Sequence, residues 1–193
     1  MNCIACASKK CRAALSCGAE SFDLGSAKAR YHRDYEQHMV QAAARLVDNG
    51  RAGNLSRIQE LIEFIKQMRY KKVGLAYCYG MESLAKQVLL LLRDKGIPTI
   101  GVSCTVGGVS QSVVNEQSDL VGVSCNPINQ ALQLEEEGVD LAVVIGLCLG
   151  HDILFNRTFT HDTTTLVVKD RLFEHAPVKG IMQLCEKPRI SGG

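Results

Sequence analysis

The stretch VVIGLCLGHD at residues 143–152 decides the fold class of this chain. A short apolar run that ends at a cysteine and continues into Gly-His-Asp is typical of a buried parallel strand that opens into a polar loop and a helix. The same order of apolar residue, glycine, apolar residues and closing cysteine occurs at residues 73–78, 100–104 and 121–125. Together with residues 164–168, these runs predict five strands.

Between the predicted strands, apolar residues recur every three or four positions, as in an α-helix. Residues 82–95 and 127–137 show this spacing, and a short helix is expected to begin at His151. Two further helices are expected before the first strand, at residues 26–49 and 54–68, packed on the sheet. Alternating strands and helices predict an α/β fold, with a doubly wound parallel sheet of the Rossmann or flavodoxin-like kind.

A separate cysteine array, C-x2-C-x4-C-x5-C, lies at the start of the chain and consists of Cys3, Cys6, Cys11 and Cys17. So short a segment has almost no apolar core, and a metal bound by the thiolates would supply its structure. The spacing is compatible with an iron–sulfur cluster and with zinc. We therefore expect three parts: a metal-binding segment at residues 1–25, a helical linker at 26–70 and the α/β domain at 71–193.

Four other cysteines, Cys78, Cys104, Cys125 and Cys148, stand at the ends of predicted strands. Ligands of open parallel sheets bind at the carboxyl ends of the strands, so these thiols are expected to face one crevice. Cysteine is also a common core residue, but its recurrence at one level of the sheet favours a shared site. Four neighbouring strand ends span about 14 Å, a gap that an iron–sulfur cluster, of the 4Fe-4S type, bridges more easily than one zinc ion.

Polar residues flank the expected crevice. His151 and Asp152 follow Cys148 and are the candidate catalytic residues, with an ordinary helix-capping pair as the alternative. A second group is expected to bind the cofactor or ligand, and it consists of Gly107, Gly108, Asn126, Gln130 and Lys169. The glycines would let backbone amides approach a ligand, while Lys169 could equally belong to a surface ion pair.

The composition narrows the class of protein. The 22 basic and 20 acidic residues are scattered along the chain, which favours neither a nucleic-acid groove nor an anionic membrane surface. No long apolar run or secretion signal is present in the sequence, so we expect a cytoplasmic protein. The nine cysteines, an odd number, fit metal ligation or redox chemistry better than a disulfide framework, and Cys185 receives no role.

Several motifs resemble one known family. They are the amino-terminal cysteine array, Cys-Asn-Pro at residues 125–127, Gly-Leu-Cys-x-Gly-His-Asp at 146–152 and Thr-Thr-Leu-Val-Val-Lys-Asp-Arg at 164–171. Together they resemble the predicted metal-binding family called domain of unknown function 1847, over nearly the whole chain. The resemblance implies metal binding and an origin in anaerobic bacteria or archaea, and it implies no particular reaction.

Three functional hypotheses follow. The first is an iron–sulfur protein, in which an amino-terminal cluster relays electrons and a sheet-edge cluster binds or reduces a small molecule. It implies a small-molecule substrate and an electron donor, and a homo-oligomer that closes the crevice is compatible with the sequence. The second is a zinc protein with a structural or metal-handling role and no catalysis. The third is a thiol redox enzyme or nucleotide-binding module without metal, although no dinucleotide or P-loop glycine fingerprint is present.

Overall fold

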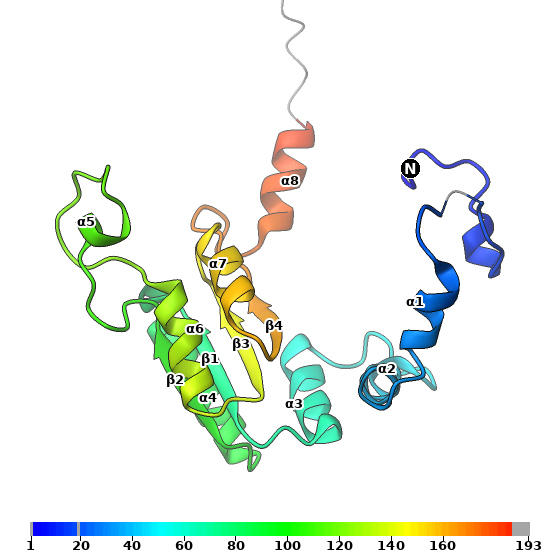
Figure 1. Ribbon diagram of the computed structural model, residues 1–193, viewed down its shortest axis with the longest axis horizontal. Helices are drawn as coiled ribbons and strands as arrows, with labels where there is room; N and C mark the ends of the chain where they lie inside the picture. Colours follow the sequence, from blue (N-terminus) through cyan, green and yellow to red (C-terminus); the bar gives the residue numbers. More distant parts are fainter. Residues whose placement is uncertain (1, 19, 187–193) are drawn as a thin grey trace, which may run out of the picture. The chain divides into compact units, whose positions relative to one another are not determined.

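The computed structural model describes residues 2–18 and 20–186. The chain divides into two compact units, Met1–Asn54 and Leu55–Gly193. Figure 1 shows the helices and strands of both units in chain order. Within the described residues, no helix combines the length and the apolar character needed to cross a bilayer.

The second unit contains a four-stranded parallel sheet. Its strands are β1 (Val73–Tyr77), β2 (Thr99–Ser103), β3 (Leu141–Ile145) and β4 (Asp162–Val167), in the order β2-β1-β3-β4. The first strand therefore lies between the second and the third, as in a flavodoxin-like sheet. The predicted α/β class and parallel sheet are confirmed.

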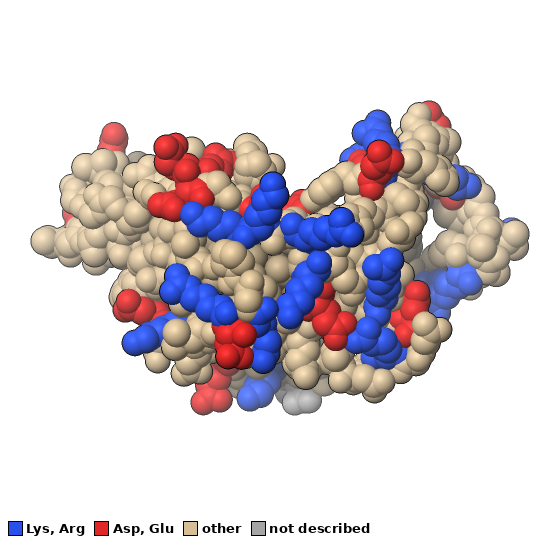
Figure 2. Space-filling model, turned by 90° about the horizontal axis from the view of Figure 1, so that it is seen from below, with Lys and Arg blue, Asp and Glu red and all other residues tan. Residues whose placement is uncertain are grey.

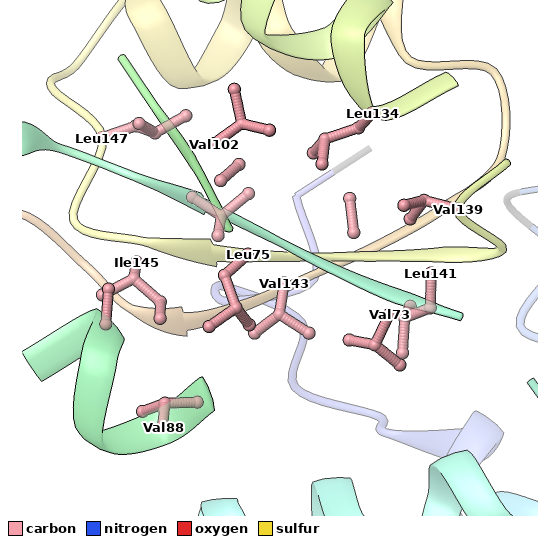
Figure 3. Close-up of a cluster of buried hydrophobic side chains, with 14 of the residues drawn as sticks. Val73, Leu75, Val88, Val102, Leu134, Val139, Leu141, Val143, Ile145 and Leu147 are labelled. Atoms are coloured by element: carbon pink, nitrogen blue, oxygen red, sulfur yellow. The ribbon is translucent and has the colours of Figure 1, made fainter. Parts of the chain in front are cut away.

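Helices pack on both faces of this sheet, α4 (Glu82–Asp94) on one face and α6 (Pro127–Glu136) on the other (Figure 3). The other helices of this unit are α3 (Arg57–Met68), the short 3-10 helix η2 (Tyr79–Met81), α5 (Gln111–Val114), α7 (His151–Thr158) and α8 (Pro177–Glu186). Alternate residues of the strands point to opposite faces. Val73, Leu75, Val143 and Ile145 point toward Val88 of α4, whereas Leu134 of α6 lies on the other face with Val102, Val139 and Leu147 (Figure 3).

The residues before β1 form a helix where the sequence predicts one. Ser56 and Gln59 make a reciprocal capping box at the start of α3, which satisfies backbone amides that have no partner within the helix. Leu61 and Ile65 are buried in the core of the sheet unit. The inner stripe expected of this helix is therefore confirmed, and it belongs to the same unit as the sheet.

The prediction that residues 121–125 form a strand is wrong. Val121 is fully exposed, and Val123 makes one isolated antiparallel bridge to Ser110. The Ser124 amide donates to the Val109 carbonyl and the Gln111 amide to the Gly122 carbonyl, so this segment pairs with the chain around the start of α5 (Gln111–Val114) instead of with a strand of the sheet. The segment therefore returns as a loop, and the sheet has four strands rather than five.

The first unit contains η1 (Lys10–Ala13), α1 (Leu24–Arg30) and α2 (Asp34–Val47). The single helix expected at residues 26–49 is interrupted, because Arg33 has an extended backbone before α2 begins. Asp23 caps α1 by accepting hydrogen bonds from the amides of Gly25 and Ser26. Asp34 lies in the first turn of α2, where a carboxylate interacts favourably with the helix dipole.

Charged side chains are distributed as the composition suggests. On the face drawn in Figure 2, lysine and arginine side chains are interspersed with aspartate and glutamate side chains.

Candidate functional site

The structure brings the four strand-end cysteines to one edge of the sheet. Cys78 directly follows β1, and Cys104 directly follows β2. Cys148 lies in the turn between β3 and α7, and Cys125 precedes α6. Although Cys125 is not on a strand, the amide of Asn126 donates to the carbonyl of Cys104 at 2.6 Å and holds the loop against β2.

Two of these thiols are in direct contact. The Sγ atoms of Cys104 and Cys125 are 3.5 Å apart. Burial, more than any other cause, raises the pKa of Cys104 to about 12, although the amide of Tyr79 donates to its sulfur at 3.3 Å. Burial also raises the pKa of Cys125, and the nearby charges of Cys148 and Cys78 raise it further. The four thiols therefore share one electrostatic environment.

The other two thiols are paired with cations from the segment after β4. Lys169 Nζ donates to Cys78 Sγ at 3.4 Å, and Arg171 Nη2 donates to Cys148 Sγ at 3.2 Å. The hydrogen bond to Cys148 is the main reason that the pKa of Arg171 is raised. Lys169 was among the predicted site residues, but Arg171 was not. The signal that could have found it is its position two residues after Lys169, at the same strand end.

The candidate catalytic residues lie at the start of α7. The amide of His151 donates to the carbonyl of Cys148 at 2.9 Å, and the His151 Nδ1 atom is buried with no hydrogen-bond partner among the described residues. Asp152 Oδ1 accepts from the amides of Gly150 and Ile153 at 2.9 and 2.8 Å. Asp152 thus orders the loop that presents Cys148, and a catalytic role for either residue stays a prediction.

Gln130 and Asn126 stabilise the sheet edge from α6. The Gln130 side chain is fully buried, and its Nε2 donates to the carbonyls of Tyr77 and Val102 at 3.1 and 2.7 Å. It therefore joins the ends of β1 and β2. Asn126 Oδ1 accepts from the amide of Asn129 and caps α6. A binding role for both residues stays a prediction.

The glycine turn after Cys104 runs beside the start of α6. Gly107 and Gly108 both have positive φ, at 84° and 60°. A Cβ atom on Gly107 would lie 3.2 Å from Asn129 Nδ2, so a side chain there would crowd the helix. The turn is exposed, and its contact with a ligand stays a prediction.

The four amino-terminal cysteines also come together. Cys3, Cys6, Cys11 and Cys17 line one hollow, together with Asn2, Ser8, Lys9 and Arg12. Hydrogen bonds lower the pKa of Cys6, first that from the backbone of Lys9 and then those from Ser8. Lys9 adopts a left-handed backbone conformation, with φ of 45°, in this turn. The hollow thus presents four thiols, one of them stabilised as a thiolate, beside two cationic side chains.

Neither set has the tight spacing of ligands around one ion. Among residues 2–18 and 20–186, no group of three or more His, Cys, Asp or Glu side chains is arranged to hold a metal ion. The donor chemistry of both sets is nevertheless that of soft-metal sites, because thiolates are the preferred ligands of zinc and of iron–sulfur clusters.

Comparison with known proteins places the chain in a family. The family model of DUF1847, described as a protein of unknown function, matches residues 18–166. This chain belongs to the DUF1847 family. The matched DUF1847 region contains all four strand-end cysteines, while the amino-terminal array, Lys169 and Arg171 lie outside it.

A protein of an archaeon is similar to this chain. The uncharacterized protein MJ0455 of Methanocaldococcus jannaschii is 34% identical to this DUF1847 protein over 178 residues, which cover 91% of this chain and 90% of the relative. No solved structure matches the chain significantly. The descriptions of DUF1847 and of this relative name no activity.

Proposed function

We propose that this DUF1847 protein is a cytoplasmic iron–sulfur protein with two cysteine-ligated centres. The amino-terminal centre would relay electrons, and the sheet-edge centre would bind or reduce a small molecule. One observation supports the proposal best: four thiols from four separate segments share one edge of the sheet, and cations donate to two of them.

The charges at the sheet edge suit several thiolates in one place. Four ionised thiols would repel one another. Burial is the main cause that raises the pKa of Cys104 and of Cys125, and the charge of Cys78 raises both further. Lys169 and Arg171 would offset this negative charge once a metal has displaced the thiol protons. Charge and hydrogen bonds to sulfur are also what set the potential of an iron–sulfur centre.

The amino-terminal hollow suits the same chemistry. Its four thiols come from fifteen consecutive residues, and its polar lining includes Lys9 and Arg12. Backbone amide donors to Cys6 stabilise a thiolate ligand. A cluster or a zinc ion would each draw the four sulfurs together, and the chemistry of the thiols does not choose between the two.

The sheet-edge residues have separable roles in this proposal. When bound there, an iron–sulfur cluster supplies electron transfer and, at an iron without a protein ligand, an open position for a small molecule. His151 begins α7 next to Cys148 and would move a proton to or from that molecule. Asp152 holds the turn through two backbone amides, and Gln130 holds the ends of β1 and β2. A small-molecule substrate and an electron donor are the partners required.

The test is the content of iron, zinc and acid-labile sulfide in protein purified without oxygen, with visible spectra before and after dithionite. We expect about four irons with matching sulfide at each filled site and a bleachable absorption band. Cys78→Ser and Cys148→Ser should remove the iron and sulfide bound at the sheet edge. Cys3→Ser and Cys11→Ser should remove the iron and sulfide bound at the amino-terminal array. Cys185→Ser, which changes an exposed thiol of α8, is the matched control and should change neither.

Two results would replace this proposal. Stoichiometric zinc in a colourless protein would support the zinc alternative. In that alternative, the amino-terminal cysteines bind a structural zinc ion, and the sheet-edge cysteines store or sense metal without catalysis. Unchanged metal content in both Cys78→Ser and Cys148→Ser would show that the sheet-edge cysteines do not bind the metal.

A further inference from the structure

We propose that Cys104 and Cys125 form a reversible disulfide that competes with metal for the sheet edge. Their sulfurs are already in van der Waals contact at 3.5 Å. A disulfide has an S–S length of about 2.05 Å, so the sulfurs must approach by about 1.5 Å. A side-chain rotation with a small loop movement can supply an approach of that size.

The backbone holds the two residues in place for this bond. Cys104 is anchored to the sheet, since its amide donates to the carbonyl of Tyr77 at 2.9 Å, and the amide of Asn126 donates to the carbonyl of Cys104. Cys125 lies in the loop that returns after α5, and its backbone is held on both sides, by the Ser124 amide that donates to the Val109 carbonyl at 2.8 Å and by the Asn126 amide that donates to the Cys104 carbonyl. Both sulfurs are therefore carried by anchored backbone, which keeps them close enough for side-chain rotation to bring them together.

The remaining two sheet-edge thiols are engaged differently. Cys78 accepts from Lys169, and Cys148 accepts from Arg171. Each of these two sulfurs thus has a cationic side chain, rather than another sulfur, as its hydrogen-bond partner. The structure thus separates the four thiols into a sulfur–sulfur pair and two cation-bound thiols.

A low-molecular-weight disulfide, such as oxidised glutathione, is the oxidant. Cys125, the more exposed of the pair, loses its proton to solvent and attacks one sulfur of the oxidant. A mixed disulfide forms at Cys125, and one glutathione thiolate leaves and takes up a proton. Cys104 then loses its proton and attacks the Cys125 sulfur, releasing the second glutathione. Two protein thiols lose two electrons in total, and one oxidant disulfide becomes two thiols.

The disulfide itself does not depend on any metal, but its regulatory consequence rests on the proposed function. Once bonded to each other, Cys104 and Cys125 can no longer act as thiolate ligands. Oxidation would therefore block loading of the sheet-edge centre and leave the amino-terminal array of Cys3, Cys6, Cys11 and Cys17 to be loaded independently. Reduction by a dithiol would restore the sheet-edge site.

The first experiment maps the bond in the full chain. Metal-free protein is equilibrated without oxygen in mixtures of reduced and oxidised glutathione, alkylated, and cleaved after glutamate. Cleavage at Glu82, Glu116 and Glu135 places Cys78, Cys104 and Cys125 in separate peptides, with Cys148 in a fourth. We expect the Cys104 and Cys125 peptides to become cross-linked with a single midpoint, which Cys78→Ser and Cys148→Ser leave in place.

The outcomes of this mapping are distinct. Cys125→Ser should abolish the cross-link and leave Cys104 as a free thiol. Free Cys104 and Cys125 at the most oxidising ratio, a glutathione adduct that never resolves, or a cross-link that contains Cys78 or Cys148 would each overturn the proposal.

The second experiment measures loading. Oxidised and reduced protein are each incubated with ferrous iron and sulfide, and iron per chain is counted after desalting. The oxidised protein should lack the iron bound at the sheet edge, and reduction with dithiothreitol should restore it. Equal iron content in both forms would show that the disulfide does not prevent iron binding. If the disulfide forms but the reduced sheet edge takes up no iron, the disulfide stands and the proposed function fails.

Discussion

The guanidinium of Arg171 donates to Cys148 Sγ at 3.2 Å, although 23 residues separate the two in the chain. The contact exists because β4 pairs with β3, and the segments that follow the two strands lie side by side. Lys169 makes the equivalent contact with Cys78 at 3.4 Å. The segment after β4 thus contributes two cations to a sheet edge whose other segments contribute thiols.

Replacing Arg171 by methionine should make the reduction potential of the proposed iron–sulfur centre at the sheet edge more negative. The reduced centre carries more negative charge, and Arg171→Met removes a cation and a hydrogen bond to a sulfur ligand. Spectroelectrochemical titration measures the midpoint. Arg157→Met changes an exposed arginine of α7 and should leave the midpoint unchanged. A midpoint unaffected by Arg171→Met would mean that the guanidinium does not interact with the centre.

The metal-free protein should lose stability at high pH. Burial raises the pKa of Cys104 from 9.0 to about 12, so the folded chain favours the protonated thiol. This stabilisation is complete below pH 9 and is lost as the pH rises toward 12. Urea unfolding in chelator at pH 7.5, 9 and 10.5 measures the loss. The midpoint should fall less steeply for Cys104→Ala than for the unchanged chain, whereas Cys185→Ala should follow the unchanged chain; identical slopes would contradict burial of the thiol.

Two glycines on neighbouring strands, Gly74 of β1 and Gly101 of β2, should respond differently to alanine. A Cβ atom on Gly74 would lie 2.7 Å from Leu134 Cδ2, inside the packing between β1 and α6. On Gly101 of β2 it would lie 3.4 Å from Tyr77 Cε1. Gly74→Ala should therefore cost about 1–3 kcal/mol of unfolding free energy, the usual range for overpacking a core. Gly101→Ala should cost less, and equal losses in urea titration would argue against close contact between α6 and β1.

Gln130→Met should weaken the fold while nearly preserving side-chain volume. The substitution leaves the carbonyls of Tyr77 and Val102 without the donor that joins them. Loss of a buried partner costs about 1–3 kcal/mol, and we expect a decrease of this size in unfolding free energy. Gln133→Met, on an exposed position of the same helix, should have little effect. Equal stability of the two variants would show that the Gln130 amide does not bind the strand ends.

The amino-terminal array should become sensitive to trypsin when metal is removed. No residue of η1 is buried, so its order in the loaded protein would come from metal held by the four thiols. Trypsin should cut metal-free protein, prepared with a chelator, at Lys9, Lys10 and Arg12 about tenfold faster than metal-loaded protein. A difference of this order is expected for a segment that folds when it binds metal. Mass spectrometry of the early fragments measures the rates. Equal cleavage of both forms would argue against a structural metal at this array.

Much of the sheet edge follows from local patterns, and the exceptions are informative. The apolar runs that end at Cys78, Cys104 and Cys148 predict β1, β2 and β3, because fully buried parallel strands are apolar throughout. Residues 121–125 have nearly the same sequence as residues 100–104 but form a loop. Strand formation needs a partner, and residues 121–125 pair with residues 109–111 instead of with an edge strand of the sheet.

The sequence by itself determined the fold class, the capping of α3 by Ser56 and Gln59, and the level at which Cys78, Cys104 and Cys148 lie, since these depend on periodicity and nearest neighbours. Only the tertiary structure decided which thiols touch and which meet a cation. The Cys104–Cys125 contact depends on how one loop returns, and the Arg171–Cys148 contact depends on the pairing of β3 with β4. Both are contacts between segments distant in the chain, and their geometry comes from strand order and loop path, which no local pattern encodes.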